Sequence, residues 1–244
     1  MSLIVLAKIP LLLLATAALH IAATPPHPPP DEKEKDAVSQ FVKLEAMLKT
    51  RSVPAIVKTI GWIACICEIF AILTASMSLI SKSGLVFRPA ITTPGHECAL
   101  GIALSPTFIA CGITAAVGGF VRWHCYRALG RLFTFEMSIR QGHTLVTNGP
   151  YAYARHPGYT AILLTVTGIA GMHAARGSWV RECDVVGTPG GFLAAGAYLL
   201  LVTMVTVGLL RRMSTEDETL KKEFGREWED YADRVPCKLV PWVY

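Results

Sequence analysis

Five long apolar stretches restrict the fold of this chain more than any other feature. They cover about residues 3–23, 55–80, 100–121, 158–175 and 189–210. A helix needs about 20 apolar residues to cross a bilayer, and each stretch is close to that length. Only 17% of the residues are charged, against roughly 25% in a soluble domain. We therefore expect an all-α, polytopic membrane protein with about five transmembrane helices.

The first stretch, within residues 1–23, admits two interpretations. Lys8 followed by an apolar run and small residues at Ala22 and Ala23 is typical of a signal peptide. The alternative is a retained first span. The next segment, 24–54, joins a proline-rich, charged linker to a pattern typical of a short interfacial helix.

The distribution of positive charge favours the retained span. Most of the 23 lysines and arginines fall within 24–55, 122–157 and 211–244. Five spans place these segments on one side, which the positive-inside rule assigns to the cytoplasm. Cleavage would leave four spans and separate the segments. The opposite side then holds Cys98 and Cys183, and an oxidising lumen permits a disulfide between them.

Two features within the spans carry further expectations. Glu68 is the one acidic residue deep within the second span, so it is expected to face the interior of the bundle. The fourth and fifth spans are rich in Gly and Ala, which let helices approach closely. Their short connection predicts an antiparallel hairpin. A cleft near Gly168 and Ala195 would then be open to a lipid chain.

Residues 134–159 carry more polar side chains than membrane anchoring requires. Arg155 and His156 come directly before Pro157, which suits the first turn of the fourth span. The free N–H groups at that helix terminus suit an anion such as a carboxylate. The alternative interpretation of the tyrosines here is an aromatic belt at the membrane interface.

The C-terminal segment, 211–244, continues the last span as an amphipathic helix. Arg212 and Glu216 lie four residues apart and so share a helix face. Apolar residues recur at helical spacing at Leu220, Phe224, Trp228 and Tyr231. Taken alone, an Arg–Glu pair on a helix is an ordinary surface pair. The amphipathic pattern indicates that this helix packs on another part of the protein.

Together these two segments resemble the isoprenylcysteine carboxyl methyltransferase family. The resemblance lies in HTLVTNGPYAYARHPGY and, after a hydrophobic hairpin, in RRMSTEDETLKKEFGREWEDYADRVP. It covers roughly residues 120–240 and implies that 122–244 form a methyltransferase core, completed by the cytoplasmic C-terminal helix. The Arg-His-Pro element alone is similar to that of other membrane methyltransferases, including phospholipid N-methyltransferases.

The resemblance also implies roles for individual residues. Cofactor binding falls to Glu136, His143, Thr144, Leu145, Val146, Tyr151, His156, Pro157, Gly158, Tyr159 and Glu216. Arg212 and Arg155 would bind the substrate, and Arg212 and Glu216 are the candidate catalytic residues. Three positions depart from the family pattern: Glu136 replaces a frequent glutamine, Gly158 a frequent serine and Asp217 a frequent glutamate.

The implied activity is S-adenosylmethionine-dependent methylation of the C-terminal carboxylate of prenylated cysteine. The expected partners are prenylated CaaX-type proteins and membrane lipid, at the endoplasmic reticulum, with the active site facing the cytoplasm. Scattered cysteines without a CxxC pair predict no metal, and no basic-aromatic run indicates nucleic acid. The alternatives are a phospholipid N-methyltransferase and a non-catalytic scaffold. The motif ending in Arg234-Val235-Pro236 favours a prenylcysteine methyltransferase over a phospholipid N-methyltransferase. The presence of both Arg212 and Glu216 favours it over a non-catalytic scaffold.

Overall fold

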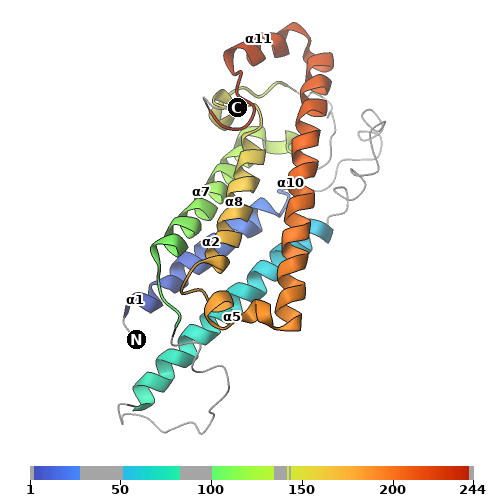
Figure 1. Ribbon diagram of the computed structural model, residues 1–244. Coiled ribbons are helices and arrows are strands. Elements are labelled where there is room, and N and C mark those ends of the chain that lie inside the picture. The colour runs from blue at the N-terminus through green and yellow to red at the C-terminus, as the bar shows by residue number, and fades with distance from the viewer. Residues whose placement is uncertain (1–2, 28–51, 83–100, 135–141, 143, 242–244) are drawn as a thin grey trace.

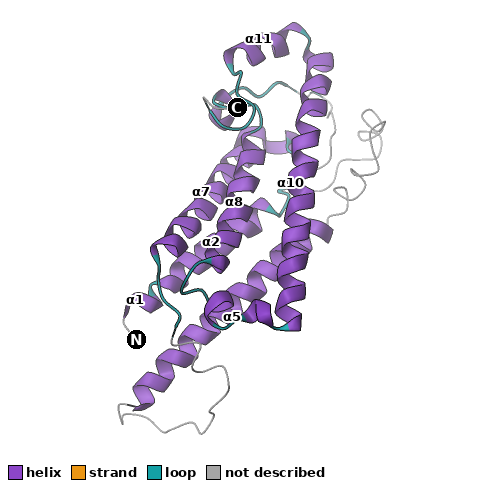
Figure 2. Cartoon of the chain, in the orientation of Figure 1, coloured by secondary structure: helices purple, strands orange, loops and turns teal. Residues whose placement is uncertain are grey.

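The described part of the chain is a bundle of helices. A computed structural model describes residues 3–27, 52–82, 101–134, 142 and 144–241, and within these ranges it contains helices, turns and no strand (Figures 1 and 2). The expected interfacial helix falls largely on 28–51, outside the described residues.

Five helices pass along the bundle in alternating directions (Figure 1). They are α2 (Lys8–Ala22), α5 (Ser52–Lys82), α7 (Pro106–Leu129), α8 (Pro157–Ala174) and α10 (Pro189–Phe224). The last four are long and apolar enough to cross a membrane. Helix α2 has 15 residues and is shorter, about 22 Å; α1 (Leu3–Leu6) precedes it. The prediction of an all-α, polytopic membrane protein is confirmed.

Proline residues set the starts of three of these helices. Pro106, Pro157 and Pro189 each occupy the first turn, where the missing N–H costs nothing. The Ser105 hydroxyl accepts a hydrogen bond of 3.2 Å from the amide of Phe108 and caps α7. Helix α7 therefore begins at residue 106, later than the hydropathy pattern predicts.

Small residues bring α7 and α8 into close contact. A Cβ built at Gly168 would lie 2.6 Å from the amide nitrogen of Ala115, so the two backbones touch there. Gly168 therefore does not line a lipid cleft. The antiparallel hairpin of α8 and α10 is confirmed (Figure 1), and its connection holds the short helix α9 (Trp179–Glu182).

A buried ion pair joins α2 to α5. The Lys8 Nζ lies 2.5 Å from Glu68 Oε1, and both side chains are fully buried. Lys8 also donates to the carbonyl of Gly177 at 2.6 Å and lies 4.0 Å from the centre of the Phe108 ring. Glu68 faces the bundle interior, as expected. Lys8 thus places a cation beside Glu68, and on the other side the His173 Nδ1 lies 3.6 Å from the Glu68 Oε2.

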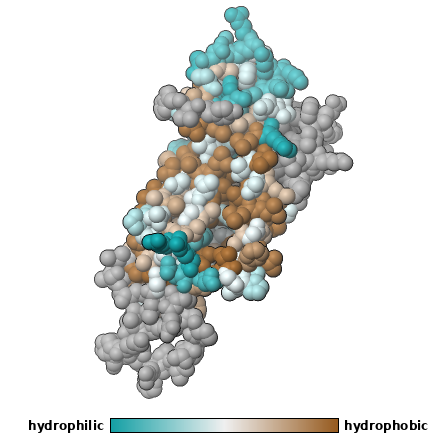
Figure 3. All heavy atoms as spheres, viewed as in Figure 1, coloured by the Kyte–Doolittle hydropathy of each residue, from teal (hydrophilic) through white to brown (hydrophobic). Residues whose placement is uncertain are grey.

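The C-terminal segment differs from the single continuous helix that the pattern predicts. Helix α10 has 36 residues, about 54 Å, and therefore extends well beyond the apolar layer. Gly225, with φ of 52°, ends it, and α11 (Arg226–Arg234) turns back across the end of the bundle (Figure 1). Figure 3 shows the polar α11 end beside a face dominated by apolar side chains.

Of the two cysteines in the predicted disulfide between Cys98 and Cys183, the structure describes only Cys183. Cys183, which follows α9, is disulfide-bonded. Cys98 lies outside the described residues.

Candidate functional site

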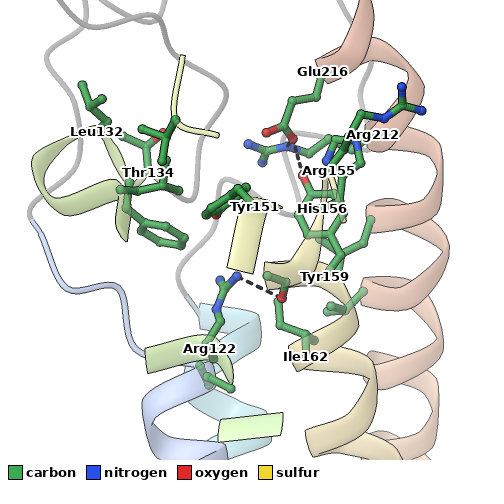
Figure 4. A pocket seen from close by; sticks show the side chains of 18 of the residues that line it. Arg122, Leu132, Thr134, Tyr151, Arg155, His156, Tyr159, Ile162, Arg212 and Glu216 are labelled. Atoms are coloured by element: carbon green, nitrogen blue, oxygen red, sulfur yellow. Dashed lines mark hydrogen bonds and ion pairs between the residues drawn. The ribbon is translucent and has the colours of Figure 1, made fainter. Parts of the chain in front are cut away.

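A cavity of about 240 Å³ lies where α2, α5, α7, α8 and α10 meet near α11. One part of its wall is polar, and Figure 4 shows the Tyr151, Arg155 and Glu216 side chains bordering a common space. The other part is apolar and follows α8 and α10 into the bundle. The polar lining includes Arg122, Tyr151, Arg155, His156, Tyr159, Arg212 and Glu216; the apolar lining includes Leu19, Val57, Ile162, Val166, Val202, Val205 and Leu209.

Among the described residues that line the cavity, Glu216 supplies the carboxylate. Its Oε2 accepts a hydrogen bond of 2.5 Å from the Tyr159 hydroxyl, and the Arg212 Nε lies 3.7 Å from the same oxygen. The Glu216 side chain is 33% exposed, so it is accessible to a ligand. The prediction that Arg212 and Glu216 share a helix face is confirmed, and both line the cavity.

His156 is held from α10 by a residue that the sequence did not single out. Its Nε2 lies 3.0 Å from the Asp217 Oδ1, and the Arg155 Nη2 lies 3.6 Å from the Asp217 Oδ2. The His156 ring stacks on the Tyr159 ring, with centroids 5.4 Å apart and planes 9° apart. The sequence analysis gives Asp217 only as a replacement for a frequent glutamate and assigns it no role. The one sequence signal for a role in the site is its position next to Glu216 in the motif.

Arg122 is a second functional candidate that the sequence reasoning missed. Its Nη1 donates to the carbonyl of Gly158 at 3.1 Å and its Nε to the Tyr126 hydroxyl at 3.1 Å. Its guanidinium also lies against the rings of Tyr126 and Phe133. In the sequence, Arg122 is one of several basic residues at the end of a span. Nothing in that pattern indicates that its side chain is buried in the wall of a cavity.

Tyr151 contributes a neutral phenol to the cavity. Burial raises the pKa of its hydroxyl well above the ordinary value, and the nearby Cys125 acts in the same direction. The hydroxyl therefore stays protonated at neutral pH. Tyr151 sits in the short 3₁₀ turn Gly149–Ala152, which follows Asn148.

The C-terminal tail closes over the segment that precedes α8. The amides of Arg155 and His156 donate to the carbonyls of Cys237 and Lys238, at 3.0 and 2.8 Å. Nearby, the Tyr231 hydroxyl donates to the Tyr151 carbonyl at 2.8 Å, and burial raises the pKa of Tyr231 to about 12. One expectation changes: because the His156 amide already has a partner, it is not a free donor for an anion.

Most of the predicted site residues come together. Leu145, Val146, Tyr151, Arg155, His156, Gly158, Tyr159, Arg212 and Glu216 all line this cavity. Thr144 is exposed and Pro157 is buried at the start of α8, and neither lines it. Glu136 and His143 lie outside the described residues. Within the part that is described, no three His, Cys, Asp or Glu side chains form a group able to hold a metal.

Helices long enough to cross a membrane, with a cavity that is polar at one side and apolar at the other, define a polytopic membrane protein with an amphipathic cavity. The model of the "Isoprenylcysteine carboxyl methyltransferase (ICMT) family" matches residues 110–179. This match confirms the resemblance to that family.

Three relatives illustrate the match. The chain is 31% identical over 135 residues to protein-S-isoprenylcysteine O-methyltransferase B of Arabidopsis thaliana, covering 54% of this chain and 58% of that protein. It is 28% identical over 129 residues to a probable protein-S-isoprenylcysteine O-methyltransferase of Oryza sativa subsp. indica, covering 52% and 58%. It is 25% identical over 103 residues to Delta(14)-sterol reductase TM7SF2 of Mus musculus, covering 42% and 20%. The matches thus span less than two thirds of each relative.

Proposed function

We propose that this protein methylates the C-terminal carboxylate of prenylated cysteine with S-adenosylmethionine. One observation carries the proposal: a single cavity joins an arginine and acid cluster to an apolar wall that continues along α8 and α10. A prenylcysteine has a carboxylate at one end and an insoluble hydrocarbon at the other. The expected substrates are CaaX-type proteins at the endoplasmic reticulum membrane, with the polar end of the cavity facing the cytoplasm.

The polar residues fit the methyl donor chemically. S-adenosylmethionine supplies a methyl group on a sulfonium and carries an amine and a carboxylate. Glu216 offers an accessible carboxylate to the amine. Arg155, which the resemblance assigns to substrate binding, lines the same polar wall. The Tyr151 and Tyr159 side chains, with Leu145 and Val146, give this part of the cavity neutral and apolar walls.

The acceptor needs orientation more than activation. A terminal carboxyl has a pKa of about 3.3–3.7, so it is ionised at neutral pH without a general base. The Arg212 guanidinium would orient it through its planar fork, while one carboxylate oxygen stays free to attack the methyl carbon. As the new O–C bond forms, the S–C bond breaks and its electron pair returns to sulfur. Such positioning contributes up to about 7–11 kcal/mol to catalysis.

The hydrocarbon would lie along the inner faces of α8 and α10. Val202, Val205 and Leu209 recur at helical spacing below Arg212, and Ile162 and Val166 face them from α8. A prenyl chain held there places its carboxylate end near Arg212. This wall replaces the Gly168 cleft as the expected lipid site.

Purified protein tests this function directly. Radiolabelled S-adenosylmethionine is offered with N-acetyl-S-farnesylcysteine or with phosphatidylethanolamine. Base-labile label on the prenylcysteine, the expected result, would establish a carboxyl methyl ester. Base-stable label on the lipid would assign the protein to the phospholipid methyltransferases. A folded sample that binds no S-adenosylmethionine would refute the methyltransferase proposal.

A further inference from the structure

Two neighbouring acids on α10 serve different sides of the site. Successive residues on a helix point about 100° apart, so Glu216 and Asp217 cannot face the same partner. Glu216 faces the cavity and accepts from Tyr159. Asp217 is 8% exposed, does not line the cavity and faces the segment before α8. Asp217 therefore contacts residues of the cavity wall and not the cavity itself.

Both oxygens of Asp217 are engaged by consecutive residues. Oδ1 lies 3.0 Å from the His156 Nε2, and Oδ2 lies 3.6 Å from the Arg155 Nη2. Both of these residues line the cavity. The carboxylate thus contacts, from behind, two side chains that a ligand would meet from the front.

The backbone of this segment is fixed independently of Asp217. The amides of Arg155 and His156 donate to the C-terminal tail, and the Thr160 hydroxyl donates to the Leu239 carbonyl at 2.6 Å. The tail therefore holds the path of the chain. What remains for Asp217 to determine is the orientation and the proton position of the His156 ring.

We propose that Asp217 is a positioning residue for the cofactor site: it keeps the proton of His156 on Nε2 and holds the imidazole ring parallel to Tyr159. This inference rests on the proposed function, which makes His156 a cofactor-binding residue. A carboxylate accepts but does not donate, so it selects the Nε2–H form of the ring. The closed set Asp217, His156, Tyr159 and Glu216 then begins and ends on adjacent residues of α10.

The test measures equilibrium binding of radiolabelled S-adenosylmethionine to the full-length protein, without any methyl acceptor. Asp217→Asn is expected to weaken binding about tenfold, because the amide removes the negative charge and can offer His156 a donor instead of an acceptor. Asp217→Glu keeps the charge and is expected to stay within about threefold of wild type. Glu218→Gln, the exposed neighbour, is the matched control and should bind as wild type does.

A double-mutant cycle with His156→Gln separates positioning from a general effect. If Asp217 acts through His156, then Asp217→Asn should add little to the loss caused by His156→Gln. Independent, multiplying losses would overturn the proposal, as would wild-type affinity in a folded Asp217→Asn protein. Wild-type protein that binds no S-adenosylmethionine would instead refute the proposed function.

A measurement on the wild type keeps the proposal testable if Asp217→Asn does not fold. Nitrogen-15 NMR of histidine-labelled protein reports which ring nitrogen carries the proton, and the His156 signal is assigned by its loss in His156→Gln. A proton on Nε2 is expected. A ring protonated on Nδ1 alone would overturn the inference.

Discussion

The hydroxyl of Tyr159 donates a hydrogen bond of 2.5 Å to the Glu216 carboxylate, across the interface between α8 and α10. This bond ties the cavity's one lining acid among the described residues to the helix on the opposite wall. It also sets the direction from which Glu216 meets a ligand. A bond to a charged acceptor of this kind is worth about 1.5–3 kcal/mol.

Tyr159→Phe is therefore expected to weaken S-adenosylmethionine binding about tenfold, because Glu216 loses the donor that orients it. Equilibrium binding of the labelled cofactor checks this. Tyr153→Phe is the control, since Tyr153 is 63% exposed and does not line the cavity. Equal affinity in the two variants would show that the Tyr159 hydroxyl does not position Glu216.

Arg212→Lys tests the assignment of the substrate carboxylate. The lysine keeps the positive charge but loses the planar fork, so turnover should fall about tenfold or more while cofactor binding is retained. Kinetics with N-acetyl-S-farnesylcysteine measure the turnover, and cofactor binding is measured separately. Arg211→Lys, at the exposed neighbouring position, is the control. Near-normal turnover in Arg212→Lys would remove Arg212 from the orienting role.

The features that could be predicted from the sequence are local along the chain. Spans follow from runs of apolar residues, because a helix satisfies its own backbone within lipid. The start of α8 follows from Pro157, and the shared face of Arg212 and Glu216 follows from their spacing. Each of these depends on residues within a few turns of one another.

The features that were missed depend on contacts between distant segments. His156 and Asp217 are 61 residues apart, and no local pattern indicates that they meet. Arg122 contacts the Gly158 carbonyl 36 residues away, so its burial is invisible in a count of flanking charges. Gly168 was assigned to a lipid cleft because small residues permit both a cleft and a tight helix contact, and the sequence does not distinguish the two.

The apolar wall of the cavity predicts a selective effect on the lipid substrate. Val205→Phe would fill part of the space along α10, so the Michaelis constant for N-acetyl-S-farnesylcysteine should rise about fivefold or more. Cofactor affinity should not change, because Val205 lies away from the polar wall. Leu200→Phe is the control, since Leu200 is 57% exposed and outside the cavity lining. An unchanged Michaelis constant with wild-type stability would place the prenyl chain elsewhere.

The ion pair between Lys8 and Glu68 predicts a strong and specific effect on stability. Lys8→Met would remove the ammonium beside the fully buried Glu68 carboxylate and leave only the more distant His173 Nδ1, at 3.6 Å, as its ionisable partner; breaking such a buried pair typically costs about 3–5 kcal/mol. The thermal unfolding midpoint in detergent should therefore fall sharply. Adding Glu68→Gln should restore much of the loss, because the uncompensated charge is then gone.

Lys58→Met is the matched control for this experiment. Lys58 also reaches α2's end, where it donates to the Thr24 hydroxyl at 3.1 Å, but its partner is neutral. Its removal should cost about 1 kcal/mol. If Lys8→Met unfolds no earlier than Lys58→Met, or if Glu68→Gln restores nothing, then the first helix is not held in the bundle by this charge pair.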